Sequence, residues 1–146
     1  MARTNDKDTV IIYNSMTTTQ QNQAILTAGS KVTLTRIVGN LHAAVDADAA
    51  ADHCTLVIYK QPQGGSTPTV ATAAGSAPID MYDNDILWAG SVTEDAATVG
   101  YQREFDIDVK GMRKMNNGDI IKLSWKSAVG DMGDVSGVLS CFYKYD

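Results

Sequence analysis

The chain has 146 residues, of which 44% are hydrophobic and 20% charged, and its formal net charge is −5. The length fits one domain, and the composition is that of a globular protein, which argues against wholesale disorder. No run reaches the roughly 18 apolar residues of a membrane-spanning helix, so we expect no membrane partner. The first residues, 1–8, have no apolar signal core and are expected to form a flexible N-terminus.

Strand signals follow one another along the whole chain, and no segment has convincing helical periodicity. The strand-like segments are rich in β-branched or aromatic residues, or alternate polar and apolar side chains. In chain order they are 9–16, 24–28, 31–45, 53–60, 85–92, 101–109, 119–127 and 137–145. This pattern predicts an all-β fold, a sandwich or a barrel, in a single domain over residues 1–146.

The third segment, 31–45, interrupts its own alternation. Val32 and Leu34 start an apolar face, but Arg36 then falls on that face, and Gly39 follows soon after. A glycine at such a break favours a β-bulge or a bend, and we expect it at Gly39.

Segments 101–109 and 119–127 resemble the two arms of a β-hairpin. Their apolar faces predict a core set of six residues: Phe105, Ile107, Val109, Ile121, Leu123 and Trp125. The opposite face of the first arm carries three carboxylates: Glu104, Asp106 and Asp108. Like charges two residues apart repel each other, so this face needs cations. Lys122 and Lys126 are the natural partners if the two arms pair; a neighbouring subunit is the alternative.

The connector between these arms, "GMRKMNNGD", contains the turn signal Asn117-Gly118. We expect it to present paired bases with methionines beside them, which is typical of a protein contact surface. The candidate subunit interface is therefore Met112, Arg113, Lys114 and Met115. A solvated loop with both methionines turned inward is the alternative.

The segment "QPQGGSTPTVATAAGSAPID", 61–80, predicts a long surface loop with little apolar anchorage beyond Val70 and Ile79. It ends in an acidic cluster that could hold calcium. The carboxylates of this cluster are Asp80, Asp83 and Asp85. The spacing fails as a calcium loop, because Leu87 and Trp88 stand where a ligand and a glycine are needed. We therefore assign no metal site.

Residue types that carry catalysis are sparse. His42 and His53 have no metal-ligand spacing, and Cys54 and Cys141 are expected to be small buried hydrophobes. No nucleophile elbow or phosphate-binding loop is present. We expect no enzyme activity, no catalytic residue and no cofactor.

Charge is unevenly distributed, which limits nucleic-acid binding. Residues 38–100 hold eight acidic residues and one base, Lys60, and such a surface repels phosphate. Ahead of Arg36 the chain offers three candidate nucleic-acid contacts: Arg3, Lys7 and Lys31.

Several stretches between residues 31 and 146 resemble single jelly-roll capsid proteins of small circular single-stranded DNA viruses. They are "KVTLTRIVGNLHA", "LVIYKQPQG" with its long loop, "ILWAGSV", "REFDIDVKGMRKMNNGDIIKLSWKS" and "GVLSCFYKY". The resemblance implies an eight-stranded antiparallel jelly-roll sandwich of two four-stranded sheets. It also implies self-assembly of many identical subunits into a small icosahedral shell, a virion component assembled inside the host cell.

Members of that family usually begin with an arm rich in Arg and Lys that neutralises packaged DNA. This chain departs from the pattern, so viral single-stranded DNA is a partner implied by the resemblance but weakly supported by the residues. A trimeric jelly-roll module that binds a receptor or a carbohydrate is the alternative function. It would use the loop at 61–80 and the acidic cluster that follows. The host receptor is not identified by the sequence.

Overall fold

The computed structural model describes residues 6–45, 52–72, 77–79, 85–94, 101–129 and 133–146, and these contain eight strands and no helix. The strands are β1 (Asp6–Met16), β2 (Gln21–Thr27), β3 (Val32–Val45), β4 (Asp52–Gln61), β5 (Asp85–Glu94), β6 (Tyr101–Met115), β7 (Ile120–Ser127) and β8 (Gly133–Tyr145). Each predicted strand is present. Among the described residues there is no helix that is long and apolar enough to span a membrane.

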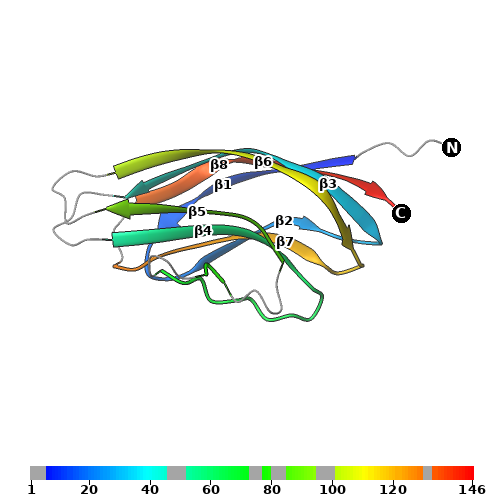
Figure 1. The fold of residues 1–146 in the computed structure, drawn as a ribbon, viewed down its shortest axis with the longest axis horizontal. Coiled ribbons are helices and arrows are strands. Elements are labelled where there is room, and N and C mark those ends of the chain that lie inside the picture. The colour runs from blue at the N-terminus through cyan, green and yellow to red at the C-terminus, as the bar shows by residue number, and fades with distance from the viewer. Residues whose placement is uncertain (1–5, 46–51, 73–76, 80–84, 95–100, 130–132) are drawn as a thin grey trace.

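The strands form two four-stranded antiparallel sheets that lie face to face (Figure 1). The order is β1-β8-β3-β6 in one sheet, called here the β1 sheet, and β2-β7-β4-β5 in the other, the β2 sheet. Strands pair from the two ends of the chain inward: β1 with β8, β2 with β7, β3 with β6 and β4 with β5. This nested pairing is the jelly-roll arrangement, so the predicted fold class is confirmed.

The core lies between the sheets, on the faces that alternation assigned. Phe105, Ile107, Ile121, Leu123 and Trp125 are each at most 8% exposed, and Val109 is partly buried against the same cluster. The predicted core set is therefore confirmed. Trp125 is held by more than packing, because its indole Nε1 donates a hydrogen bond to the carbonyl oxygen of Ser15 at 3.0 Å.

The expected hairpin of 101–109 with 119–127 is wrong. Strand β6 pairs with β3, whereas β7 pairs with β2 and β4 in the opposite sheet. The turn between β6 and β7 crosses from one sheet to the other, so Lys122 and Lys126 cannot face the carboxylates of β6. Lys122 instead donates to Thr67 Oγ1 at 3.0 Å.

The expected bulge at Gly39 is also misplaced. The register shifts between Leu34 and Arg36, where Leu34 lies opposite Arg113 and Arg36 opposite Lys110. The bulge turns Arg36 outward and lets Ile37 point into the core at 0% exposure. Gly39 has another role, since a β-carbon there would collide with the carbonyl oxygen of Val138 on the adjacent strand.

The first strand begins closer to the N-terminus than predicted. Strand β1 begins at Asp6, and Asp6, Lys7 and Asp8 lie opposite Tyr143, Phe142 and Cys141 of β8. The prediction of a flexible segment over 1–8 is wrong for these three residues. Residues 1–5 lie outside the described residues.

The long segment after β4 is a loop outside the sandwich, but it is anchored more firmly than its composition suggests. Val70 and Ile79 are 1% and 2% exposed and form a second apolar cluster with Val57 and Tyr59, on the outer face of β4. Gln20 adds a polar clamp. Its amide donates to the Pro68 carbonyl at 2.8 Å and accepts from the Val70 backbone N–H at 2.7 Å. The loop therefore covers part of the β2 sheet.

A buried carboxylate fixes the start of this loop to the turn before β7. Asp119 is 6% exposed, and its two oxygens accept hydrogen bonds from the backbone N–H groups of Gln63 and Asn116 at 3.0 and 2.9 Å. We expect Asp119→Ala to lower the free energy of unfolding by about 2 kcal/mol, because both donors lose a charged acceptor. Asp119→Asn keeps one acceptor and should lose less. Urea unfolding measures both, and an alanine variant as stable as the parent would contradict this role.

Candidate interaction surfaces

The predicted interface at the end of β6 does not form one exposed patch. Met112 is 63% exposed and Lys114 is exposed, but Met115 is 1% exposed and belongs to the core. Arg113 is committed within the chain, since its Nε donates to Asp85 Oδ2 at 2.8 Å. The expectation of four exposed residues is therefore wrong for Met115, whereas the Arg113 side chain is 39% exposed although it is paired with Asp85. A subunit interface at these residues stays a prediction.

The reason is that β6 does not end at Val109. It continues through Gly111 to Met115, so the period-two alternation applies to residues expected in a turn. Met115 then points into the sandwich, and only 116–119 form the connector. The alternative, a solvated loop with both methionines turned inward, is right for the inward side chain of Met115 and wrong for Met112, which is exposed.

The acidic cluster is described only at Asp85, because Asp80 and Asp83 lie outside the described residues. The Asp85 carboxylate is bound by the Arg113 guanidinium. Among the residues with described positions, no group of three or more His, Cys, Asp or Glu side chains could hold a metal ion.

Two of the three predicted nucleic-acid residues are described, and Arg3 is outside the described residues. Lys7 is exposed on β1, and Lys31 is exposed between β2 and β3. Lys7 lies in a row that crosses the outer face of the β1 sheet. The residues of this row, from β1 to β6, are Lys7, Phe142, Arg36 and Lys110.

The charges of this row are partly neutralised within the sheet. Arg36 binds Asp108 through two hydrogen bonds, Nε–Oδ1 at 2.8 Å and Nη2–Oδ2 at 2.9 Å, and Lys110 Nζ lies 3.8 Å from the same carboxylate. The hydrogen bond from Arg36 holds the pKa of Asp108 below its ordinary value. Because both partners are exposed, this pair contributes little stability. It does reduce the positive potential available to a phosphate.

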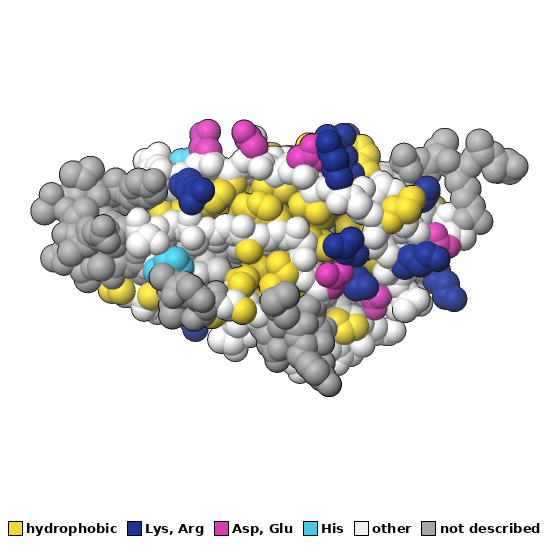
Figure 2. All heavy atoms as spheres, viewed as in Figure 1, with side chains coloured by type: hydrophobic (Ala, Val, Ile, Leu, Met, Phe, Trp, Pro, Cys, Tyr) yellow, Lys and Arg dark blue, Asp and Glu magenta, His cyan; other side chains and the backbone are white. Residues whose placement is uncertain are grey.

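The other β6 carboxylates are exposed. Glu104 and Asp106 continue the acidic face toward the far end of the strand. Figure 2 shows acidic side chains projecting along the upper edge of the molecule, where β6 runs, with basic side chains beyond them. The outer face of the β1 sheet is therefore acidic along β6.

An apolar patch lies on the opposite side of the same face. Ile11 and Tyr13 on β1 are 80% and 75% exposed, and Val138 on β8 is 41% exposed. Ile11 and Val138 lie directly opposite each other in the β1–β8 register, so the three side chains form one group, called here the β1 patch. Large apolar side chains gathered on a surface mark interaction sites.

The sequence interpretation missed the β1 patch, although a signal was present. The stretch "TVIIYNSM" places Ile11, Ile12 and Tyr13 in a row, so one face of the strand could not hide them all. Ile12 takes the core side, at 1% exposed. Residues 9–16 also carry no charge, in contrast to β6.

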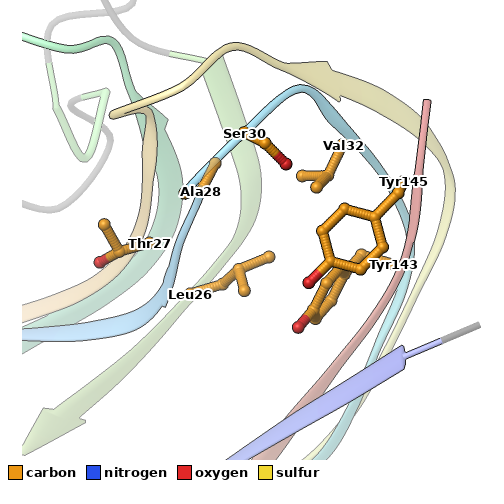
Figure 3. A pocket seen from close by; sticks show the side chains of 8 residues that line it. Leu26, Thr27, Ala28, Ser30, Val32, Tyr143 and Tyr145 are labelled. Atoms are coloured by element: carbon orange, nitrogen blue, oxygen red, sulfur yellow. The ribbon is translucent and has the colours of Figure 1, made fainter.

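A pocket of about 220 Å³ opens between the ends of β2 and β8 (Figure 3). Leu26 and Val32 form part of its apolar wall, and the rings of Tyr143 and Tyr145 stand edge to face beside it, with centroids 5.8 Å apart. The Tyr143 hydroxyl donates to Asp8 Oδ1 at 3.3 Å. Desolvation against the core, and then the Asp8 charge, raise the pKa of Tyr143 to about 12. The pocket is smaller than usual small-molecule sites, which span about 300–1,000 Å³.

The histidines and cysteines are placed as expected of structural residues. His42 Nε2 lies 3.1 Å from Gln102 Oε1, and His53 Nδ1 lies 2.7 Å from Thr93 Oγ1. Cys54 and Cys141 are both 0% exposed, which confirms the prediction of small buried hydrophobes. Burial raises the pKa of the Cys141 thiol to about 12, so the reactive thiolate is disfavoured.

Comparison with known proteins yields weak structural similarity and no family. No family model matches the sequence, and no curated protein matches it. The solved structures with some similarity include a chain of the disulfide-linked pili of Bacillus endospore appendages, with 12% identity and a TM-score of 0.41 over 100% of this chain and 93% of that chain.

Two further similar structures come from infectious bursal disease virus. One is from the Gx strain, with 10% identity and a TM-score of 0.40, covering 94% of this chain and 32% of that chain. The other is the VP2 subviral particle, with 11% identity and a TM-score of 0.34, covering 97% of this chain and 32% of that chain. At these values the similarities assign neither a family nor a function to this chain.

Proposed function

We propose that this chain is a structural subunit that assembles with many identical copies into a closed shell, and that it is not an enzyme. The observation that carries the proposal is the β1 patch, in which Ile11, Tyr13 and Val138 expose apolar surface on a regular sheet. Exposed apolar groups of this kind are costly in water and are typically covered by a partner. Identical copies supply that partner most simply, through contacts that symmetry closes.

The finer form of the proposal is a viral capsid. Its support is the sequence resemblance to single jelly-roll capsid proteins together with the eight-stranded jelly roll, and it makes the protein a virion component assembled in the host cell. DNA contributes little to this assembly. Arg36 and Lys110 already share the Asp108 carboxylate, and the net charge of −5 opposes packaging of phosphate.

The test is the size of the purified, nuclease-treated protein, measured by light scattering after gel filtration and by negative-stain microscopy. We expect closed particles that persist without nucleic acid. Raising the salt concentration should loosen them only in part, because salt screens ion pairs and leaves apolar contacts. A protein that stays monomeric at all concentrations, or particles that vanish with nuclease, would overturn the proposal.

The binding-module alternative has one observation in its favour, the pocket beside Tyr143 and Tyr145. Its volume of about 220 Å³ admits little more than one ring or side chain. A trimer of constant size that binds a glycan or receptor fragment, with loss of binding in Tyr145→Ala, would favour this alternative over a shell.

A further inference from the structure

Four strands of this fold lie at sheet edges, and they differ in how their backbones are protected. The edges are β1 and β6 in one sheet and β2 and β5 in the other. An edge strand presents unpaired N–H and C=O groups that can pair with another chain. Proteins usually block such pairing with charges, bulges or covering side chains.

The edge strand β6 is protected by charge. Glu104, Asp106 and Asp108 are exposed at alternate positions of the strand. A second β6 laid against it would bring carboxylates of the two copies together, and like charges in adjacent strands destabilise pairing.

The edge strand β5 is covered by side chains from β6. Arg103 Nη1 donates to the Ser91 carbonyl at 2.8 Å, so that backbone group is already satisfied. Arg113 binds Asp85 at the start of β5, and the rings of Trp88 and Phe105 pack edge to face at 5.2 Å. A further strand would have to displace these contacts.

The edge strand β2 is short and irregular. It spans Gln21–Thr27, and its register slips between Ala24 and Leu26. A bulge on an edge disturbs the regular spacing that a new strand needs.

The edge strand β1 starts with three charged residues, Asp6, Lys7 and Asp8, but has none of these protections over the stretch that follows. It has 11 residues, and in the described structure no strand pairs with its outer side. Residues 9–16 are uncharged, and Ile11 and Tyr13 are highly exposed. Only the C-terminal end of the strand is covered. There the Asn14 side-chain amide donates a hydrogen bond to the Gln21 side chain, and the Trp125 indole donates one to the Ser15 carbonyl. The open, uncharged length therefore runs from Thr9 to Tyr13.

We propose that the β1 strands of two copies pair antiparallel across a twofold axis and join two β1 sheets into one continuous eight-stranded sheet. This inference rests on the proposed function and names one of its subunit contacts. The occupant is a second copy because the uncharged stretch can meet itself without repulsion. Antiparallel pairing also sends the two Lys7 side chains to opposite ends of the contact. The two β1 patches then lie side by side and shield each other from water.

The first test adds a charge to the open edge. Ile11→Lys changes a side chain that is 80% exposed, so the fold should persist, which circular dichroism and thermal unfolding would verify. We expect this variant to lose assembly and the parent to assemble. The matched control is Ala89→Lys, which adds the same charge at an exposed position of the protected edge β5 and should assemble like the parent.

The outcomes separate this contact from the function. A parent that never assembles overturns the proposed function. A parent that assembles together with an Ile11→Lys variant that does so equally well overturns β1 pairing and leaves the shell proposal standing. Equal loss of assembly in Ile11→Lys and Ala89→Lys also overturns β1 pairing, because the added charge and not its position would then be responsible.

The second test places single cysteines at Thr9, Ile11 or Tyr13, whose side chains lie on the outer face of the sheet. Antiparallel pairing brings at least one of these positions near its copy, so mild oxidation should yield a disulfide-linked dimer on a non-reducing gel. The parent is the baseline, since Cys54 and Cys141 are buried. Ala89→Cys, at an exposed position of the protected edge β5, controls for random collision. No dimer from any β1 position, or as much from Ala89→Cys, would overturn the proposal.

Discussion

Replacement of Trp125 by alanine is expected to lower the free energy of unfolding by about 3–5 kcal/mol. Trp125 is 2% exposed and lies in the cluster between the two sheets, so its removal leaves a cavity lined by side chains that cannot all close in. The change also leaves the Ser15 carbonyl without the indole N–H that it accepts at 3.0 Å. Since Ser15 lies near the end of β1 and Trp125 lies in β7, this hydrogen bond connects the two sheets.

Two further variants divide this loss into its parts. Trp125→Phe keeps most of the apolar volume and removes the hydrogen bond, so it should lose less than the alanine variant. Met112→Ala removes a large side chain that is 63% exposed and should stay within about 0.5 kcal/mol of the parent. Chemical denaturation of the three variants gives the comparison. If Trp125→Ala and Met112→Ala unfold alike, Trp125 is not a core residue.

Replacement of Gly39 by alanine is the second change with a large expected effect, a loss of about 3 kcal/mol in the free energy of unfolding, at the upper end of the usual cost of overpacking. Gly39 lies in β3, between β8 and β6, in the interior of the β1 sheet. The new methyl group would collide with the carbonyl oxygen of Val138 and crowd the Leu139 α-carbon at 3.0 Å. These are backbone atoms held in sheet pairing, so the neighbouring strand must shift to admit the methyl group.

The matched control for this change is Gly29→Ala. No atom lies within 4 Å of a β-carbon built at Gly29, so this methyl group meets open space and should change the stability little. Thermal unfolding of both variants checks the contrast. A Gly39→Ala variant that melts with the parent would show that the two strands separate more easily than their register implies.

The outer face of the β1 sheet gives the two proposals a common physical basis. One side, along β6, carries exposed carboxylates, and the other side, along β1, carries apolar side chains. The carboxylates oppose pairing of the β6 edge with another strand, whereas the uncharged stretch of the β1 edge does not. Under both proposals, self-association is therefore expected on the β1 side of the sheet.

The sequence by itself determined the all-β class, the eight strands and the core faces, because these follow from local alternation. The jelly roll was implied only by the resemblance to a known family. Residues such as Ile107, Leu123 and Trp125 are spaced two positions from other apolar residues. Because alternate residues of a strand lie on the same face, such a set forms the buried face. The buried cysteines were predictable for the same reason, because Cys54 and Cys141 each occupy an apolar position of an alternating strand. Where alternation broke, as at Arg36, the sequence indicated a bulge but not its position.

Only the tertiary structure decided which strands are neighbours and which edge is open. Strands β6 and β7 follow each other along the chain yet lie in opposite sheets, so Arg36 and not Lys122 meets Asp108. The anchoring of Val70 in the long loop likewise depends on the outer face of β4. Ile11 is exposed because it lies on the outer face of the sheet, and it is more exposed than Val138 beside it because β1 has a neighbouring strand on one side only. Strand order arises from contacts between distant segments, and local alternation carries no information about it.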